Sequence, residues 1–400
     1  MADDYDLIVA GCGPAGSAAA TVAACGGARV LLLDRALFPR DKLCAGLLTW
    51  KTVQTLTRLF GETPESLSAL GVINHKSSFY RIRHRDALLS EGKLVYPFHF
   101  VERRVFDAYC LERAKAAGAE TLLGQAVVWT DPDQAMVRVR DGRTFTGKYL
   151  IGADGALSAV RAHCPADQAA LRRERGMGLE VYLSREWLAL RAGLHEDVLA
   201  SFPTIYSGFI DAGYSWCFPH RDRVIVGICG LYRGRPAGMI GARFEDFLNF
   251  LGLPKDHGLP VKGHPLPYGG WLSRPVFGKT LLAGDAAGLV EPFFGEGIHY
   301  ALRTGELAGQ ACLQGLHGQS DPTRHYLAAL NREIFPELTW AKRLRNLLYW
   351  FVRLGLLLPV KTFLGGGGTR LQEMVHGMRS FRLLRKLTPP AGERRPLSPP

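Results

Sequence analysis

Asp6-Leu7-Ile8-Val9-Ala10 leads into Gly11-Cys12-Gly13-Pro14-Ala15-Gly16 and then Ser17-Ala18-Ala19-Ala20, and this stretch decides the fold. The apolar run predicts a strand and the small residues predict a helix. The glycines between them predict the tight turn of a dinucleotide-binding site. Glycine lets the backbone approach a pyrophosphate, and the amides that open the helix donate hydrogen bonds to it.

The next strand strengthens this interpretation. Residues 28–33 are apolar and end in Asp34, 18 residues after Gly16. An acidic side chain at that point accepts hydrogen bonds from an adenosine ribose. A glycine turn alone is weak evidence, but strand, turn, helix, strand and terminal acid together predict a Rossmann-like unit that binds a dinucleotide.

A second glycine-rich segment lies far downstream. Residues 280–283 predict a short buried strand, which runs into Gly284-Asp285-Ala286-Ala287-Gly288, then Gly295-Glu296-Gly297-Ile298, and a helix over about 299–308. An aspartate at the end of a strand can bind a ribityl hydroxyl. The amides that open the next helix can face a flavin ring and its phosphates. This segment therefore favours a flavin dinucleotide.

A third segment is Ile151-Gly152-Ala153-Asp154-Gly155, followed by Ser158 and Arg161. With these three segments, most of the chain resembles the FAD-dependent oxidoreductases of the glutathione-reductase and hydroxybenzoate-hydroxylase type. The resemblance implies FAD as the cofactor and a strand-to-helix junction near the flavin at residues 151–161. Asp154 can equally serve as a turn residue or a helix cap.

Two further patterns narrow the family. Lys42-Leu43-Cys44-Ala45-Gly46 has the form K-x-C-x-G, and Tyr214-Ser215-Trp216-Cys217-Phe218-Pro219 has the form Y-x-W-x-F-P, with Gly227 eight residues after Pro219. With Arg103 and Phe106-Asp107, these strings resemble the geranylgeranyl reductase family, flavoproteins that hydrogenate isolated double bonds of polyprenyl chains on chlorophylls, archaeal-type ether lipids or quinones. The resemblance implies that Cys44 lies near the flavin and that Tyr214 and Trp216 line a lipid cavity.

These patterns define the expected site. The expected catalytic residues are Cys44, Tyr214 and Trp216. The expected cofactor-binding residues are Gly11, Gly13, Pro14, Ala15, Gly16, Asp34, Arg35, Lys42, Cys44, Ala45, Gly46, Arg103, Asp154, Gly284, Asp285, Gly295, Gly297 and Ile298. No metal ligands are expected, because none of the eight cysteines forms a C-x-x-C pair.

The expected chemistry is demanding, because an isolated alkene has no carbonyl to accept a hydride. We expect an acid to protonate the alkene while the reduced flavin supplies hydride to the developing tertiary cation. Cys44 is the proton donor, a modulator near the ring, or a small packing residue. Glu296 is expected either to orient the flavin or a proton, or to cap a helix. Aromatic faces can stabilise the cation; the candidates, which line a tunnel or form ordinary core, are Phe202, Tyr206, Phe209, Tyr214, Trp216 and Phe218.

Two other functions stay open. An aromatic hydroxylase of the same flavin fold would use NAD(P)H and oxygen, although the K-x-C-x-G and W-x-F-P strings speak against it. The second open function is that of a non-catalytic flavoprotein that docks on membranes or partners. Because FAD takes the one G-x-G-x-x-G, no second Rossmann unit is available for a nicotinamide. The expected electron donor is therefore transiently bound NADPH or a ferredoxin-like protein.

The positive charge is concentrated near the C-terminus. The net charge is +12, and residues 340–400 hold twelve Lys and Arg against Glu373 and Glu393. The apolar run at 347–358 is too short and too charged to span a bilayer. Aromatic and leucine-rich, with basic flanks, it suits an anionic membrane surface, or it caps the protein as a helix. Nucleic acid is not an expected partner, because no recognition motif accompanies the charge.

The expected fold class is α/β, or α+β overall, with a Rossmann-like FAD-binding domain, an antiparallel-sheet substrate domain and a C-terminal helical segment. Without a secretory signal, the protein is expected in the cytoplasm, peripheral at the inner face of the membrane. Residues 48–100 are expected to be mixed with loops, 135–149 to form a hairpin turning at Asp141-Gly142, and 365–368 to be flexible. The expected boundaries are 1–75, 100–165 and 275–340 for the FAD-binding domain, 76–99 and 166–274 for the substrate domain, 341–388 for the basic helical segment, and 389–400 for a disordered tail.

Overall fold

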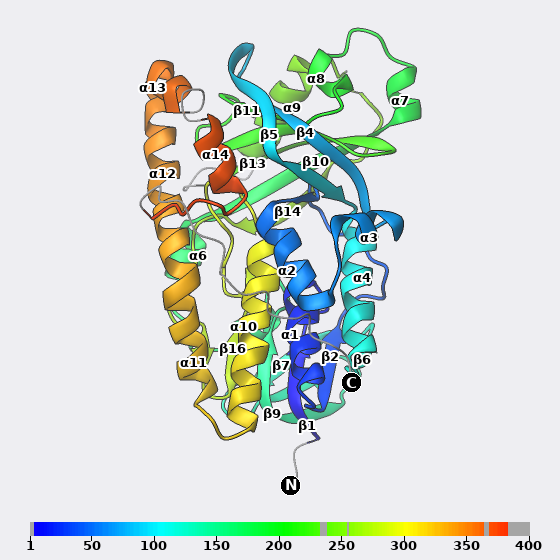
Figure 1. Ribbon diagram of the computed structural model, residues 1–400, viewed down its shortest axis with the longest axis vertical. Helices are drawn as coiled ribbons and strands as arrows, with labels where there is room; N and C mark the ends of the chain where they lie inside the picture. Colours follow the sequence, from blue (N-terminus) through cyan, green and yellow to red (C-terminus); the bar gives the residue numbers. More distant parts are fainter. Residues whose placement is uncertain (1–3, 233–237, 254–255, 364–367, 383–400) are drawn as a thin grey trace.

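The computed structural model describes residues 4–232, 238–253, 256–363 and 368–382. Within them the chain forms two sheets that follow one another along the long axis of the molecule, each covered by helices (Figure 1). The predicted fold class, α/β with a Rossmann-like unit and a second, largely antiparallel sheet, is confirmed. Most of the predicted glycine run at 365–368 and all of the tail at 389–400 lie outside the described residues.

The lower sheet in Figure 1 is Rossmann-like, with a parallel core in the order β16-β9-β1-β2-β6. Its central strand is buried on both faces, as expected for a parallel sheet covered by helices. The antiparallel pair β8·β9 turns at Asp141-Gly142, as predicted. The strands are β1 (Tyr5–Ala10), β2 (Val30–Asp34), β6 (Glu120–Leu123), β7 (Val127–Asp131), β8 (Met136–Val139), β9 (Thr144–Gly152), β15 (Val276–Phe277) and β16 (Thr280–Leu282).

Small residues let helices pack closely beside this sheet. α1 packs against α4 and α10, and a Cβ at Gly305 of α10 would lie only 2.0 Å from the carbonyl oxygen of Ala15. α10 extends well beyond the predicted 299–308, to Leu316, and its buried glycines Gly305 and Gly309 pack against α1 without ending the helix. The elements here are α1 (Pro14–Cys25), α4 (Arg103–Ala116), α5 (Ala159–Ala162), α6 (Ala169–Arg173), η1 (Gly284–Ala286), α10 (Ile298–Leu316) and α11 (Pro322–Ala329).

The upper sheet has the order β14-β10-β13-β12-β11-β4-β5-β3. Its pairs are antiparallel, as predicted, except that β11 and β4 run parallel. The strands are β3 (Leu47–Leu48), β4 (Ile73–His84), β5 (Ala87–Val101), β10 (Arg175–Ser184), β11 (Thr204–Ser207), β12 (Gly213–Pro219), β13 (Arg223–Leu231) and β14 (Lys262–Pro267).

Residues 48–100, expected to be mixed with loops, contain more regular structure than the sequence indicates. They form α2 (Trp50–Phe60), α3 (Pro64–Ala69) and the long β4–β5 hairpin. The strands carry many charged and histidine side chains, since much of this hairpin is only partly buried. A solvated strand gives a weak alternation signal, and only its partners in the sheet reveal it.

The face of the upper sheet that points away from the lower sheet has its own core. α7 (Arg185–Ala189), α8 (Glu196–Leu199) and α9 (Gly238–Phe250) cover this face. Tyr206, Phe209 and Phe247 pack together there, with Tyr206 and Phe247 ring centroids 5.1 Å apart. This core holds the sheet rigid from behind and leaves its other face free to line a site.

The C-terminal segment forms a helical column along one side of both sheets (Figure 1). It contains the π-helical turn Leu330–Ile334, α12 (Phe335–Arg353), α13 (Leu357–Lys361) and α14 (Gly368–Val375). The fully buried Arg345 attaches the column to the body, because its Nη1 donates to the Tyr268 carbonyl at 2.6 Å and its Nη2 to Glu174 Oε2 at 3.0 Å. Among the described residues, no helix is long and apolar enough to cross a bilayer.

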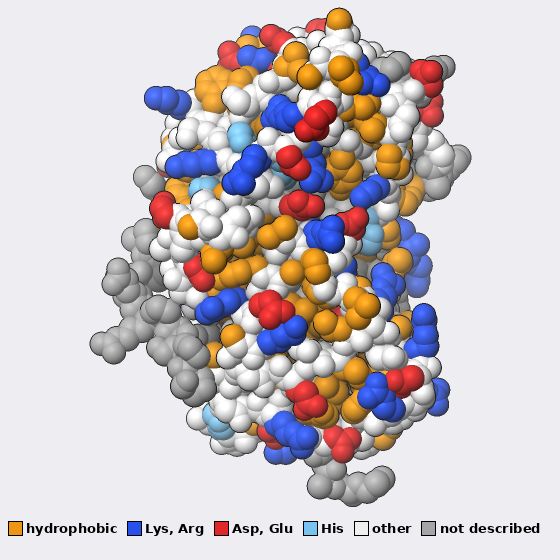
Figure 2. Space-filling model, turned by 90° about the vertical axis from the view of Figure 1, so that its right-hand side faces the viewer, with side chains coloured by type: hydrophobic (Ala, Val, Ile, Leu, Met, Phe, Trp, Pro, Cys, Tyr) orange, Lys and Arg blue, Asp and Glu red, His pale blue; other side chains and the backbone are white. Residues whose placement is uncertain are grey.

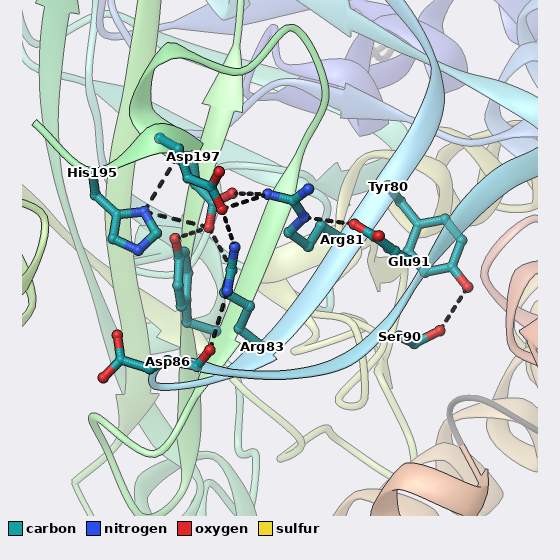
Figure 3. A network of polar contacts seen from close by, with 10 residues as sticks. Tyr80, Arg81, Arg83, Asp86, Ser90, Glu91, His195 and Asp197 are labelled. Carbon is teal, nitrogen blue, oxygen red and sulfur yellow. Dashed lines mark hydrogen bonds and ion pairs between the residues drawn. The ribbon is translucent and has the colours of Figure 1, made fainter.

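An ion-pair network ties β4 to the covering helices of the upper sheet (Figure 3). The buried carboxylate of Asp197 in α8 accepts from Arg81 Nη1 at 2.7 Å and Arg83 Nε at 2.8 Å, and also from the hydroxyl of Tyr206. Burial alone would raise the pKa of Asp197, but the hydrogen bonds from Tyr206 and Arg81 and the charges of both arginines lower it. The ionised carboxylate therefore stabilises the parallel junction between β4 and β11.

We expect Asp197→Asn to lower the free energy of unfolding by about 3 kcal/mol at neutral pH, because two largely buried guanidinium groups lose their shared carboxylate. A group with a depressed pKa stabilises the fold above its unfolded value of about 4 and loses that effect as the pH falls. Urea unfolding should thus show a difference from wild type that shrinks in acid. The matched control is Glu91→Gln at the exposed end of the network, with a cost below about 1 kcal/mol. A difference that is constant across pH would contradict the ion-pair explanation.

Candidate functional site

A cavity of about 990 Å³ runs between the two sheets. It begins at the turn between β1 and α1, passes the segment 40–46 and the loop before α10, and reaches α14. The cavity is thus polar and glycine-rich at one end and apolar at the other. These two ends correspond to the two kinds of ligand that the sequence predicts.

The glycine turn forms the polar end, and its glycines have different tasks. Gly11 has φ +103°, and a Cβ there would lie 2.4 Å from the carbonyl oxygen of Ala153. Gly16 does not line the cavity; a Cβ there would lie 1.7 Å from the carbonyl oxygen of Gly11, so it lets α1 start against β1. Gly13 lines the cavity and has open space beside it, its nearest neighbour being Arg40 at 3.5 Å.

Asp34 holds the turn in shape as well as facing the cavity. Its Oδ2 accepts from the Cys12 amide at 2.7 Å and its Oδ1 accepts from the Ala36 amide at 2.9 Å. Arg35 lines the cavity beside it. The carboxylate therefore positions the amides of the glycine turn, which the sequence pattern alone did not show.

Asp154 and Arg161 join the third predicted segment to the second. Asp154 lines the cavity, and its carboxylate also accepts from the amides of Ala159 at 2.7 Å and Val160 at 3.1 Å, so it caps α5. Burial raises the pKa of Asp154 against these hydrogen bonds. The guanidinium of Arg161 donates to the carbonyl of Ala286 at 2.6 Å. The two segments are therefore held together next to the cavity.

The remaining predicted cofactor residues lie around the middle of the cavity. Arg103 forms a bidentate pair with the buried Asp107 at 2.7 and 2.9 Å, which fixes the guanidinium next to the site. Gly284 lies behind the cavity wall, where a Cβ would lie 3.2 Å from the Ala15 Cβ. Burial lowers the pKa of Lys42, and the charge of Asp285 opposes this shift. The lining residues here are Lys42, Cys44, Ala45, Gly46, Arg103, Asp285, Gly295, Gly297 and Ile298.

Glu296 is a buried ion-pair partner. Its Oε1 accepts from Thr49 Oγ1 at 2.6 Å and Thr52 Oγ1 at 3.1 Å, and its Oε2 lies 2.5 Å from Lys51 Nζ. It does not cap a helix, since α10 begins after Gly297 without a side-chain cap. Glu296 therefore fixes the loop before α10 to α2.

The apolar end is lined by the upper sheet and by α14. The hydroxyl of Tyr214 donates to the Phe294 carbonyl at 2.5 Å, and the ring of Trp216 lies 5.6 Å from that of Tyr214. Of the six aromatic residues predicted for a tunnel, Tyr214, Trp216 and Phe218 line the cavity. For the other three the tunnel alternative is wrong. Tyr206 and Phe209 lie in the core on the other face of the sheet, and Phe202 packs against Phe79.

Several lining residues have no sequence motif. Tyr80, Phe98 and Leu94 come from the hairpin that the sequence did not predict, and Leu371 and Val375 come from α14. Glu180 is a buried acid on β10, opposite Gly227 in the strand register. Only the strand pairing could have found it, because its local sequence carries no recognisable pattern.

Comparison with known proteins agrees with this geometry. A family model described as an FAD binding domain matches residues 4–196. A menaquinone reductase of Mycobacterium tuberculosis (strain ATCC 25618 / H37Rv) is 32% identical over 343 residues, covering 77% of this chain and 76% of that protein. A geranylgeranyl diphosphate reductase of Rhodobacter capsulatus is 30% identical over 325 residues, covering 77% and 75%. The chain belongs to the geranylgeranyl reductase family of FAD-dependent oxidoreductases.

Solved structures of low sequence identity share the fold of this family member. A geranylgeranyl bacteriochlorophyll reductase-like protein of Thermoplasma acidophilum superposes with a TM-score of 0.71 at 18% identity, covering 86% of this chain and 87% of that one. The halogenase PltM superposes with a TM-score of 0.70 at 15% identity, covering 96% and 88%. The polar end of the cavity fits FAD, because α1 starts without a side-chain cap beside the open Gly13 and Asp34 stands at the end of β2.

We expect Gly13→Ala to weaken FAD binding without unfolding the protein. Its backbone, with φ −72° and ψ −177°, accepts alanine, but the new methyl group occupies the open space beside the turn. The FAD dissociation constant, measured by fluorescence quenching on the apoprotein, should rise at least about tenfold, a loss of about 1.4 kcal/mol. The apoprotein should melt at the wild-type temperature.

The matched variant is Gly11→Ala. Its Cβ meets the Ala153 carbonyl, and its positive φ disfavours any side chain. This variant should therefore lose thermal stability as well as FAD. Equal melting temperatures for the two variants would show that the glycines do not have separate roles.

Proposed function

We propose that this protein hydrogenates isolated carbon–carbon double bonds of a polyprenyl lipid or quinone chain, with FAD as its redox cofactor. The observation that carries the proposal is the continuity of the cavity, in which an aromatic and aliphatic arm opens directly from the FAD-binding end. A prenyl chain is long and apolar, and such an arm can take it up to the flavin. Relatives of about 30% identity that are called menaquinone reductase and geranylgeranyl diphosphate reductase support it.

The residues at the junction of the FAD-binding end and the apolar arm of the cavity fit this chemistry. Bound FAD supplies the hydride chemistry once reduced, and the protein supplies orientation and electrostatics. Cys44 lines the junction, and its Sγ accepts from the Gly46 amide at 3.4 Å, which orients the thiol within the loop. In the proposal Cys44 lies beside the flavin ring, and Tyr214 and Trp216 present their faces to the cationic carbon. The electron donor is proposed to be NADPH or a ferredoxin-like protein.

The C-terminal column supports a membrane-bound substrate. Exposed Trp340, Leu347 and Trp350 on α12 and Leu354 directly after it follow one another at helical spacing, and Leu358 of α13 is 76% exposed. Arg343 lies over the Trp340 ring at 4.7 Å. The side of the molecule that Figure 2 shows, around α3 and α4, instead mixes acidic, basic and apolar side chains. We infer that the α12–α13 stripe rests on an anionic bilayer at the inner face of the membrane.

The position of this stripe would bring the membrane close to the apolar end of the cavity. Leu348 and Phe351 of α12 pack under Leu371 of α14, and α14 lines the apolar end of the cavity. The helices that would touch the bilayer therefore also cover the substrate end of the site. A prenyl chain that leaves the bilayer beside this column has a short path to the cavity.

The test of the proposed function is anaerobic incubation of the chemically reduced holoprotein with geranylgeranyl diphosphate and, separately, with a menaquinone. We expect product masses to rise by pairs of hydrogens in mass spectrometry, because each reduced double bond gains two. No mass change with either lipid would contradict the proposal for these carriers. Gain of an oxygen atom in air with NADPH would instead place the protein among the hydroxylases.

The same assay tests the role proposed for Cys44. We expect Cys44→Ala to keep its FAD, because other groups hold the cofactor, but to turn over about tenfold or more slowly, because the thiol beside the ring tunes its chemistry. A wild-type rate at unchanged flavin content would assign Cys44 to packing. Cys110→Ala, at a fully buried thiol outside the cavity lining, is the matched control.

We expect the triple variant Leu347→Ser, Trp350→Ser and Leu354→Ser to bind vesicles of mixed anionic and neutral phospholipid about tenfold more weakly than wild type, since it loses the apolar contact. Co-sedimentation measures this binding, and added salt should weaken it for both proteins. The control is Leu70→Ser with Val105→Ser, two exposed apolar positions, the first directly after α3 and the second on α4. Equal binding by the two variants would contradict a membrane role for the stripe.

A further inference from the structure

The strand register of the upper sheet places an acid in the wall of the substrate arm. Glu180 on β10 pairs with Gly227 on β13, and Gly227 pairs with Trp216 on β12. Directly paired residues project to the same face of a sheet. Glu180 and Trp216 therefore share the face that lines the cavity, and both line it.

Gly227 has no side chain, so it leaves a space between Glu180 and Trp216 on this face of the sheet. A Cβ there would lie 2.3 Å from Cζ2 of Trp216, so the indole ring lies directly over the glycine. No side chain on β13 stands between the carboxyl of Glu180 and the indole. The glycine that follows the Y-x-W-x-F-P string thus brings an aromatic face and an acid to neighbouring positions in one wall.

The carboxyl of Glu180 is buried, and one of its oxygens makes no close hydrogen bond. Its side chain is 0% exposed, and its Oε2 accepts from the Tyr182 hydroxyl at 2.8 Å. Its Oε1 has no partner within hydrogen-bond distance and angle among the described residues, although the Cys44 amide lies close enough to the carboxyl to favour its ionised form. The K-x-C-x-G loop lies against the same strand, since a Cβ at Gly178 would lie 3.6 Å from Leu43 Cδ2. A buried polar atom without a partner in a cavity wall calls for a ligand or a chemical task.

The other buried acids of this region are engaged elsewhere. Glu296 also lines the cavity, but its carboxylate is paired with Lys51 and accepts from the hydroxyls of Thr49 and Thr52. Glu291 accepts from the amides of Phe293 and Phe294 and does not line the cavity. Among the cavity-lining residues that belong to the described strands of the upper sheet, Glu180 is the one carboxylic acid.

We propose that Glu180 is the catalytic acid that protonates the alkene carbon of the bound prenyl chain. This inference rests on the proposed function. The O–H bond of the carboxylic acid breaks, and the alkene π electrons form a new C–H bond at the less substituted carbon. The adjacent tertiary carbon accepts a hydride from reduced FAD, so the alkene gains two electrons and the flavin is oxidised. Glu180, left as a carboxylate, takes a proton from solvent, and NADPH or an iron–sulfur protein re-reduces the flavin.

The electrostatics of the site are compatible with this role. Burial raises the pKa of Glu180 to about 7, against the Tyr182 hydrogen bond, the charge of Lys42 and the amide of Cys44. Lys262 on β14 also lowers the pKa, and the thiol of Cys229 faces the carboxyl from β13. The acid is thus present near neutrality, and the indole of Trp216, which lies over Gly227 in the same wall, can stabilise positive charge.

The first test is Glu180→Gln in the reduced holoprotein. Glutamine keeps the size of the side chain and an acceptor for Tyr182 but cannot give up a proton. We expect anaerobic reoxidation of the flavin by a prenyl substrate to slow at least about 100-fold, the range for loss of a general acid. FAD content, melting temperature and the flavin spectral change on substrate binding should stay at wild-type values. Glu112→Gln, at an exposed acid on α4, is the matched control.

The second test measures the protonation state of Glu180 and its effect on the rate. The wild-type rate should fall as the pH rises through about 7, because the acid form is lost. Tyr182→Phe removes a hydrogen bond that favours the carboxylate, so this fall should move to higher pH. Infrared difference spectra of wild type against Glu180→Gln, which need no turnover, should show a protonated carboxyl band at pH 5 that is absent at pH 9. Glu180→Asp, which keeps an acid, should retain a slower, pH-dependent rate.

The outcomes separate this inference from the proposed function. If the wild type reduces a prenyl chain and Glu180→Gln does so at the same rate, the inference is wrong and the proposed function stands. An unmoved pH profile in Tyr182→Phe, or a carboxylate band at pH 5, also overturns it. If the wild type reduces no prenyl chain, the proposed function fails and this assignment fails with it.

Discussion

The close approach of three backbone segments at the start of α1 is the constraint on which the rest of the structure depends. A Cβ at Gly11 or Gly16 would collide with a carbonyl oxygen of β9's following loop or of Gly11 itself. Because these positions have no side chain, α1 can begin directly against β1, and its uncapped amides face the cavity. Asp34 then fixes the turn by accepting from the Cys12 amide at 2.7 Å. The cofactor end of the site is therefore a product of backbone packing.

The substrate end depends on the register of the upper sheet in a similar way. Successive residues of a strand face opposite sides, so one face of β12 and β13 carries Trp216 and Gly227 toward the cavity. The other face carries Val226 and Cys217 toward the core under α9. The helical cover makes the sheet a rigid wall, and the ion pairs around Asp197 attach the β4–β5 hairpin to it (Figure 3). A wall of this kind can hold aromatic faces and an acid in fixed positions beside a flexible chain.

The C-terminal column lies between the apolar end of the cavity and the surface of the protein. Its inner face is attached through the buried Arg345 and covers the apolar end of the cavity through α14. Its outer face exposes Trp350 and Leu354. In the proposed function, the two faces of this helical column would connect the cavity to the bilayer in which a prenyl lipid resides. The two interpretations of the segment are compatible, since a helix can pack on the protein and still present an apolar stripe.

The sequence by itself determined the Rossmann-like unit, FAD as cofactor and the family, because glycines at backbone contacts and an acid at a strand end are local requirements that leave local patterns. It also singled out Cys44, Tyr214 and Trp216, and all three line the cavity. The tertiary structure alone decided three features. They are the β4–β5 hairpin, the burial of Tyr206 away from the cavity, and the position of Glu180 in the cavity wall. Each depends on which strand lies beside which, and strand register arises from contacts between residues far apart in the chain.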